Sequence, residues 1–341
     1  MIVLFPTYAR RLPDGRWRAR VEGMVTLPLP ENSRRRTLAL AVLRRLLDLD
    51  GDQLDSEVFR RRAGAFLFQR VAGRRVVVHV AGRPVAAALT DRSGHFRAEI
   101  DLVDVPVAPG AGVRRVECAA EAEAGDEPPL GAPATGVIEL VADAGASVIS
   151  DIDDTVKVTN VADRRELLRN TFLREFIPVP GMPEVFRGWV DAGTAFHYVS
   201  ASPWQLAPCL GGFLAAAGLP AGSMHLKLFR LKDSTPLRRL PSRKRSKRRV
   251  IEQIMADFPG RRFLLVGDSG ERDPEVYAAV ARRRPAQVAG IAIRLVPTRA
   301  APWKVRERLA ALSKKLPADG ITVFESPAEL AARHGLSNAF W

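Results

Sequence analysis

Three carboxylates in four positions are the first residues whose types and spacing could do chemistry. The stretch SVISDIDDTVKVTN, residues 147–160, places Asp151, Asp153 and Asp154 directly after a short apolar run, with Thr155 next to them. Neighbouring carboxylates repel one another unless positive charge lies between them. A bound cation would remove this repulsion, and hard oxygen ligands of this kind suit Mg²⁺.

Other apolar runs end in similar residues. The run 196–199 is followed by Ser200 and Ser202, and the run 263–266 by Asp268 and, one turn later, Asp273. Each aspartate alone could serve as a helix N-cap, and Asp273 before Pro274 suits that role well. A cap needs only one oxygen, however. If the three runs are neighbouring strands, four carboxylates and two hydroxyls meet in one crevice.

The elements that position these residues follow from the pattern of the chain after residue 145. Apolar runs alternate with helical patterns, which predicts a parallel sheet with helices on both faces. The predicted strands include 148–149, 195–199, 263–266 and 289–293, and the predicted helices are 164–174, 183–192, 203–217, 247–257, 274–283, 303–316 and 327–334. Ligands of such sheets bind at the carboxyl ends of the strands. We therefore predict an α/β domain over residues 146–341.

Residues 1–145 have the pattern of a β-rich domain. In 16–25, apolar Trp17, Ala19 and Val21 alternate with charged residues after a Pro-Asp-Gly turn, as in a half-buried strand. Further strands are predicted over 75–80, 85–89, 95–102 and 136–141, with a helix over 36–49 and a loop over 121–133. The sequence thus predicts a β-sandwich-like domain before the α/β domain.

The charge of the chain favours a polyanionic partner. Among its 341 residues, 52 Lys and Arg face 38 Asp and Glu, a formal net charge of +14. Nucleic acid, an anionic membrane surface and phosphorylated ligands all suit such a charge. The basic residues lack the interleaved aromatics of a base-stacking platform, which argues against nucleic acid.

The cysteines and the hydropathy of the chain bear on its location. Cys118 and Cys209 are the two cysteines, and they lie too far apart for paired-cysteine metal spacing. No stretch approaches the roughly 18 uncharged apolar residues of a membrane span. We expect a cytoplasmic protein that is either soluble or attached to a membrane only at its surface.

The motifs follow one another in the order found in haloacid-dehalogenase-like phosphatases. DIDDT (151–155), SASPW (200–204), DFP (257–259) and GDSGERDPEVY (267–277) together resemble the catalytic domain of the actin-patch-protein family of Mg²⁺-dependent phosphatidate phosphatases, which is related to lipins. The resemblance covers roughly residues 146–295. It implies a Rossmann-like parallel sheet of the haloacid-dehalogenase type.

The resemblance also implies roles for individual residues. Asp151 would be the nucleophile that forms an aspartyl-phosphate, and Asp153 the acid that protonates the leaving oxygen and later activates water. Ser200 would bind a phosphoryl oxygen. Asp268 would hold Mg²⁺ together with the Asp151 carboxylate and the Asp153 backbone carbonyl. Further candidates without an assigned role are Thr155, Ser202 and Asp273, together with Asp154, for which a local turn is the simpler interpretation.

The family requires a lysine that neutralises charge between nucleophile and phosphate. We assign this role to Lys247, which lies in the basic run 238–249, with Lys244 as the alternative. Such a run is by itself typical of a solvated surface. Near the crevice it could also hold the protein on an anionic lipid surface, in which case neutralising 243–245 would weaken vesicle binding.

The expected activity is hydrolysis of phosphatidate to diacylglycerol and phosphate. Two alternatives stay open at this point: a phosphatase for another, soluble phosphomonoester, and a non-catalytic lipid-binding module on the same fold. The presence of both Asp151 and Asp153 argues for an active enzyme.

Overall fold

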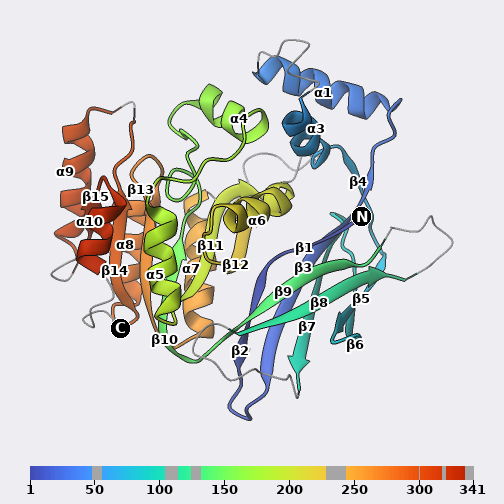
Figure 1. Ribbon diagram of the computed structural model, residues 1–341, viewed down its shortest axis with the longest axis horizontal. Coiled ribbons are helices and arrows are strands. Elements are labelled where there is room, and N and C mark those ends of the chain that lie inside the picture. The colour runs from blue at the N-terminus through green and yellow to red at the C-terminus, as the bar shows by residue number, and fades with distance from the viewer. Residues whose placement is uncertain are drawn as a thin grey trace.

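A computed structural model shows that the chain forms two β-sheets (Figure 1). It describes residues 1–47, 56–103, 114–123, 132–227, 243–298, 300–316 and 320–334. One sheet is built from the N-terminal strands and the other from the strands after residue 143. No helix within these ranges is both long enough and apolar enough to cross a membrane.

The second sheet is parallel, as the sequence predicts. In the described part of the chain it has six strands in the order β12-β11-β10-β13-β14-β15. All five pairings are parallel. The strands are β10 (Ala144–Ser150), β11 (Ala195–Pro203), β12 (Ser223–Lys227), β13 (Gly260–Asp268), β14 (Val288–Arg294) and β15 (Thr322–Phe324).

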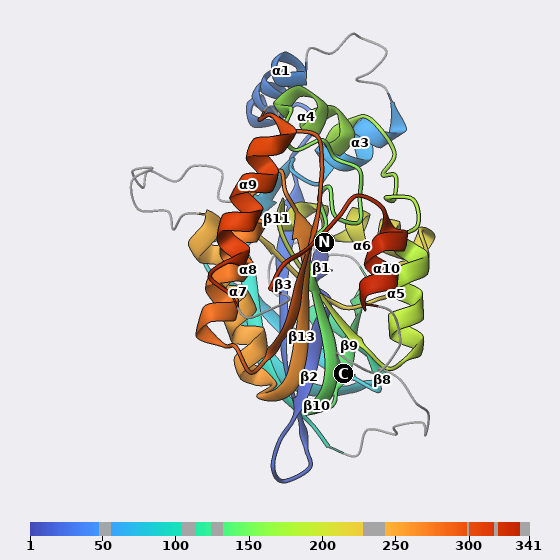
Figure 2. The same ribbon diagram turned by 90° about the vertical axis from the view of Figure 1, so that its left-hand side faces the viewer.

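Helices cover both faces of this sheet (Figure 2). One face carries α5 (Met182–Asp191), α6 (Ala207–Ala216) and α10 (Pro327–His334), and the other carries α7 (Arg243–Asp257), α8 (Asp273–Arg283) and α9 (Pro302–Ser313). Adjacent residues of the central strand β10 are buried on opposite faces of the sheet. Val148 packs in the cluster that contains α5, and Ile149 packs in the cluster that contains α7. Burial on both faces explains the apolar runs of these strands.

Three predicted boundaries need correction. The helix expected from Pro203 begins at Ala207, because β11 continues to Pro203 and Trp204–Leu206 form a 3-10 turn. The helix α7 begins at Arg243, four residues before Lys247, since arginine and lysine are good helix formers. In α8 the N-cap residue is Arg272, so Asp273 lies inside the first turn rather than at the cap.

The N-terminal strands form a mainly antiparallel sheet. Its main path runs β1-β3-β2-β9-β8-β5-β6, and both β4 and β7 also pair with β3. The strands are β1 (Ile2–Leu4), β2 (Thr7–Arg11), β3 (Trp17–Pro28), β4 (Phe68–Arg70), β5 (Arg75–Val80), β6 (Arg83–Leu89), β7 (His95–Leu102), β8 (Arg114–Ala122) and β9 (Ala134–Val141). The expected alternation holds in β7, where Phe96, Ala98 and Ile100 are buried.

Hydrogen bonds join these strands into one nine-stranded sheet. The β-rich character is therefore confirmed, while the arrangement as a two-sheet sandwich and the domain boundary at residue 145 stay predictions. The first two residues of the expected loop 121–133 belong to β8, and 124–131 lie outside the described residues.

Three helices lie at the end of the molecule to which the carboxyl ends of the parallel strands point. The helices α1 (Arg34–Leu47) and α3 (Glu57–Gly64) come from the N-terminal part, and α4 (Arg164–Phe172) follows the 151–163 loop. Figures 1 and 2 both place all three at this end of the molecule. The Arg62 guanidinium of α3 donates to the backbone carbonyls of Thr171 and Arg174 at 2.8 and 2.6 Å, which ties α3 to α4. The expected helix over 36–49 is α1, and residues 48 and 49 lie outside the described residues.

Candidate active site

The acidic residues meet because β10 lies between β11 and β13. Asp151 directly follows β10, and Asp268 is the last residue of β13. Ser200 and Ser202 lie near the carboxyl end of β11. The prediction that these strands are neighbours is confirmed. The carboxyl edge of the sheet thus collects the side chains that the sequence singles out.

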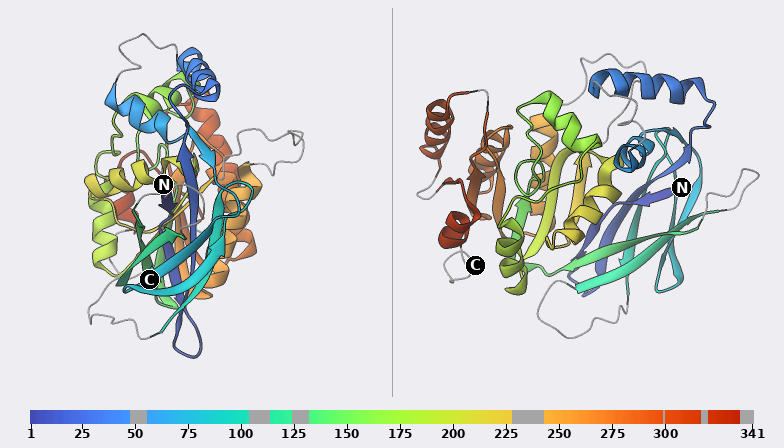
Figure 3. Two further views of the ribbon diagram at one scale, coloured as in Figure 1. Left: turned by 90° about the vertical axis from the view of Figure 1, so that its right-hand side faces the viewer. Right: turned by 45° about the horizontal axis from the view of Figure 1, so that its top comes forward.

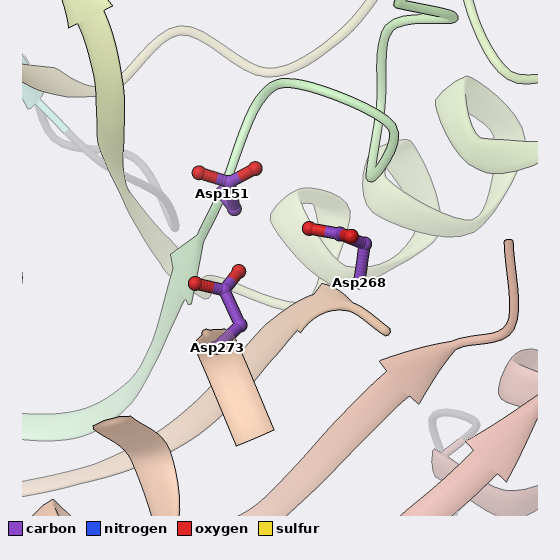
Figure 4. Close-up of side chains that lie close together, drawn as sticks. All are labelled: Asp151, Asp268 and Asp273. Atoms are coloured by element: carbon purple, nitrogen blue, oxygen red, sulfur yellow. The ribbon is translucent and has the colours of Figure 1, made fainter. Parts of the chain in front are cut away.

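Asp151, Asp268 and Asp273 form a compact buried cluster. Figure 4 shows their three carboxylates turned toward a common space, from the ends of β10 and β13 and the start of α8. One oxygen of each lies within 4.8 Å of the others. Oδ2 of Asp151 and Oδ2 of Asp268 are buried and have no hydrogen-bond partner among the described residues. Unsatisfied carboxylate oxygens converging in this way fit a hard divalent cation.

Lys247 compensates part of this negative charge. Its ammonium group donates to Oδ1 of Asp151 at 2.7 Å and to Oδ1 of Asp273 at 2.6 Å. All three side chains are at least nine-tenths buried. The assignment of Lys247 as the lysine near Asp151 agrees with this geometry; the side chain of the alternative, Lys244, lies outside the described residues.

The charges in the cluster perturb one another. Burial, with Asp273, Asp268 and Asp153 nearby, raises the pKa of Asp151 well above its usual value, although Lys247 opposes the shift. Burial and Asp273 likewise raise the pKa of Asp268. Burial disfavours the Lys247 ammonium, but Asp151 and Asp273 outweigh that effect and raise its pKa. One lysine therefore does not balance three buried carboxylates, and the cluster favours additional positive charge.

Gly267 makes room for Asp273. A Cβ atom at this position would overlap with Oδ2 of Asp273 and lie 2.7 Å from the ring of Tyr277. The Tyr277 hydroxyl donates to the carbonyl of Val266 at 3.0 Å and fixes α8 against the end of β13. The glycine of the Gly-Asp-Ser motif is thus required for close packing between strand and helix.

Asp153 belongs to a different set of contacts. Its Oδ1 lies 2.8 Å from the ammonium of Lys157, and its Oδ2 accepts from Ser200 at 3.1 Å and from Ser202 at 2.6 Å. Thr159 also donates to Oδ1 at 2.9 Å. The carboxylate is therefore fully engaged.

These contacts separate the two catalytic candidates chemically. Burial alone would raise the pKa of Asp153, but Lys157 and the hydroxyls of Ser202 and Thr159 lower it to about 2. Its carboxylate is also absent from the metal-compatible cluster, where Asp273 stands instead. This is compatible with the expectation that Asp153 contributes its backbone carbonyl to the metal, which stays a prediction.

Asp154 has a structural role that the sequence left open. It adopts a left-handed backbone conformation, with φ of 54°. Its Oδ1 accepts from the amides of Thr159 and Asn160, and its Oδ2 from the amide of Val161, each at 2.7 Å. Arg294 donates to its carbonyl at 2.7 Å. Asp154 thereby closes the loop that carries Asp151 and Asp153.

Thr155 and Trp204 are both buried near the site. The Thr155 hydroxyl has no partner among the described residues, so no contact assigns it a role. Trp204 packs against the rings of Phe5, Phe68 and His95 at 5.2 to 5.8 Å. Trp204 therefore packs the end of β11 against the N-terminal sheet.

Sequence reasoning missed Lys157, Thr159 and Arg294. Lys157 is four residues from Asp153 in the sequence, and this spacing was the available signal. Its ammonium also donates to Thr159 at 2.5 Å. The contact depends on the turn at Asp154, where the Asp154 amide donates to the Lys157 carbonyl.

The fold and site define an α/β protein with a lysine-bridged acidic cluster at the carboxyl edge of its parallel sheet. A family model described as phosphatidate phosphatase APP1, catalytic domain, matches residues 146–295. Residues 146–295 are therefore similar to that catalytic domain.

Two fungal relatives each align with 154 residues of the chain. Phosphatidate phosphatase APP1 of Saccharomyces cerevisiae is 38% identical over 154 residues, covering 44% of this chain and 26% of the relative. An uncharacterized protein of Schizosaccharomyces pombe is 34% identical over 154 residues, covering 44% and 25%. The match therefore spans about a quarter of the length of these relatives.

Solved structures add little to this comparison. A Mesorhizobium loti protein described as a HAD-like phosphatase is 15% identical, with 63% of this chain and 100% of that chain covered, and the TM-score is 0.32.

Proposed function

We propose that this protein is a Mg²⁺-dependent phosphatidate phosphatase that acts through an aspartyl-phosphate. The observation that carries the proposal is Asp151, in a segment that matches the APP1 catalytic-domain family. One of its oxygens is held by Lys247, and the other has no partner among the described residues. A buried carboxylate held in this way is positioned as a nucleophile toward phosphorus.

In the first step an oxygen of Asp151 attacks the phosphorus of phosphatidate. The bond between phosphorus and the glycerol oxygen breaks, and Asp153 gives its proton to that oxygen, which releases diacylglycerol. In the second step Asp153 takes a proton from water, whose oxygen attacks the same phosphorus. The phosphorus–oxygen bond to Asp151 then breaks, and inorganic phosphate leaves.

Asp151, Asp268 and Asp273 would hold the cation, which supplies positive charge that screens the phosphoryl oxygens from Asp151. Lys247 adds a fixed positive charge beside the nucleophile. Both charges favour the ionised form of Asp151, which burial disfavours.

Asp153 must gain a proton before it can act as an acid. In the absence of substrate its pKa is about 2, because burial is outweighed by Lys157 and by donated hydrogen bonds. An arriving phosphate dianion would raise this pKa by repulsion. If Ser200 and Ser202 turn their hydroxyls to the phosphate oxygens, two hydrogen bonds to Asp153 are lost as well. Substrate binding would therefore favour the protonated form of Asp153.

We further propose that the enzyme works in the cytoplasm as a peripheral membrane protein. The net charge of +14 supports attraction to anionic lipid. The alternatives, a soluble phosphomonoester as substrate or a non-catalytic lipid-binding module, predict different products in the same assay.

Phosphate release from phosphatidate vesicles, measured with Mg²⁺ and with excess chelator, tests the proposal. We expect release by the wild type that needs Mg²⁺, and loss of at least about a thousandfold in Asp151→Asn and Asp153→Asn. Equal release by all three proteins would contradict the catalytic assignment. Release from p-nitrophenyl phosphate but never from phosphatidate would favour the soluble substrate, and no release from either would favour the binding module. Trapping of acid-stable label from ³²P-phosphatidate at Asp151 tests the covalent step.

A further inference from the structure

The helix α1 exposes large apolar side chains to solvent at the end of the molecule that carries the site. Leu38 is 68% exposed and Val42 is 50% exposed. They are four residues apart and thus lie on one face of the helix. Among the large apolar residues that the structure describes, Leu38 has the highest exposed fraction.

The opposite face of α1 packs on the protein. Leu40 packs against the buried cluster of Phe59, Ala63 and Phe172 that joins α3 to α4. Residues two positions away on a helix point in nearly the opposite direction. Leu38 and Val42 therefore face away from the body of the protein.

The outward face of α1 is basic as well as apolar. At 100° per residue, Arg34, Arg35 and Arg45 lie within about 60° of Leu38, and all three are exposed. The helix sequence RRRTLALAVLRRLL contains no acidic residue. Arginines beside apolar side chains can keep their charge in water while their stems cover apolar surface. A face of this composition suits an anionic lipid surface, where an amphipathic helix lies in the headgroup region.

Other exposed apolar residues lie at the same end. Ile177 is 58% exposed, and its carbonyl accepts from the amide of Val158, close to the loop of Asp153. Trp303 is 62% exposed and is the second residue of α9. In the same helix, Arg308 donates to the carbonyl of Ser269, which follows Asp268. Tryptophan is favoured at membrane interfaces.

We propose that α1 is a membrane-docking helix that turns the carboxyl edge of the parallel sheet toward an anionic bilayer. Figure 3 shows α1 at this end in two further views, clear of the parallel sheet. Docking there would place the carboxyl edge of the parallel sheet on the membrane side of the protein. The proposal rests on the proposed function for its purpose, but its test does not depend on catalysis.

The test measures sedimentation with phosphatidylcholine vesicles, with or without one-fifth phosphatidylserine, so that no substrate is present. We compare the wild type with Leu38→Ser/Val42→Ser and with Arg34→Gln/Arg45→Gln. Leu89→Ser is the matched control, because Leu89 is 66% exposed on β6 of the N-terminal sheet. We expect binding only to the anionic vesicles, weakened about tenfold or more by each α1 variant and unchanged by the control.

Several outcomes would overturn the proposal. Equal binding of the α1 variants and the wild type, or binding lost only when Arg243, Lys244 and Arg245 are neutralised, would place the docking surface elsewhere. A wild-type dimer that the Leu38 and Val42 substitutions convert to a monomer, with vesicle binding intact, would assign the face to a second copy of the chain.

Hydrolysis of p-nitrophenyl phosphate separates this proposal from the proposed function. We expect the α1 variants to retain wild-type activity on this soluble ester, since none of the four residues lies in the acidic cluster. If the wild type shows no phosphatase activity, the proposed function fails while the vesicle result stands. If the variants hydrolyse the soluble ester normally but bind vesicles like the wild type, the docking proposal alone fails.

Discussion

The ammonium of Lys247 lies 2.7 Å from Oδ1 of Asp151, and both side chains are buried. The same ammonium lies 2.6 Å from Asp273, so a single lysine bridges two carboxylates from different elements. Removing it leaves a buried cluster of three carboxylates without its only observed counter-ion among the described residues. This relationship makes the stability and the chemistry of the site interdependent.

We expect Lys247→Met to lower the free energy of unfolding by about 3–5 kcal/mol in the absence of metal, because it leaves buried charge uncompensated. Activity should fall as well, since the charge beside Asp151 is lost. Urea unfolding and phosphate release measure the two effects. The double variant Lys247→Met/Asp273→Asn serves as the control, because it removes one carboxylate too. It should recover part of the stability and none of the activity; a single variant as stable as the wild type would contradict the bridging role.

Asp268→Asn should stabilise the protein when no divalent cation is present. Burial and Asp273 raise the pKa of Asp268, so its charged form is disfavoured in the folded state. Asparagine can keep the bonds that Oδ1 accepts from the amides of Gly270 and Glu271 at 2.5 and 3.0 Å. We expect a gain of about 1 kcal/mol in the free energy of unfolding, measured with chelator present.

The same variant should lose the response to Mg²⁺. A cation that binds only the folded state raises Tm, and the stabilisation grows with the logarithm of its concentration relative to its Kd. We expect Mg²⁺ to raise the Tm of the wild type and of Asp191→Asn, an exposed control on α5, but not of Asp268→Asn. An equal rise in all three proteins would show that the cation binds elsewhere.

The acidic cluster could be predicted from the sequence because its motifs follow strands of one parallel sheet. Asp151 and Asp268 each end an apolar run, and parallel strands bring such ends to one edge. The central strands could be recognised for the same reason, since burial on both faces requires continuous apolar residues. The short strands β12 and β15 at the sheet edges were missed, because five and three residues carry too little pattern.

The contacts of Asp153 and Asp154 could not be predicted from the sequence. They depend on one left-handed residue that folds the loop back so that Lys157 returns to Asp153. In the N-terminal sheet, β7 pairs with β3 rather than with β6, although a short turn joins β6 to β7. Local turn signals do not reveal such long-range pairing. The tie between α1, α3 and α4 is likewise a contact between distant parts of the chain.

Asp154→Ala should unfold far more easily than a variant of an ordinary helix cap. The substitution removes the acceptor of three backbone amides. It also leaves alanine, a residue with a Cβ atom, in the left-handed conformation at φ of 54°. We expect a loss of roughly 3–5 kcal/mol in the free energy of unfolding, because each bond to a carboxylate contributes about 1.5 kcal/mol or more. Asp154→Asn, which tolerates this φ and keeps the Oδ1 bonds, should lose less.

The control for Asp154 is Asp163→Ala, at the exposed N-cap of α4. Asp163 accepts from the amides of Arg165 and Glu166, and loss of such a cap costs about 1 kcal/mol. Equal losses in the two alanine variants, measured by urea unfolding, would argue that Asp154 acts as a simple cap and does not close the loop that carries Asp151 and Asp153.

His225, which lies outside the acidic cluster, should make stability depend on pH. Burial lowers its pKa from 6.5 to about 4, and its Nε2 lies 3.0 Å from the hydroxyl of Ser223. Between these values the unfolded chain binds a proton that the folded protein does not, so stability is lost as the pH falls from 6.5 to 4. The loss due to His225 is on the order of 2–3 kcal/mol. His225→Gln lacks this pH-dependent contribution. The difference in free energy of unfolding between wild type and variant should therefore shrink by about 2–3 kcal/mol as the pH falls from 6.5 to 4. Urea unfolding of both proteins at several pH values measures it, and a difference that stays constant with pH would show that His225 titrates normally in the folded protein.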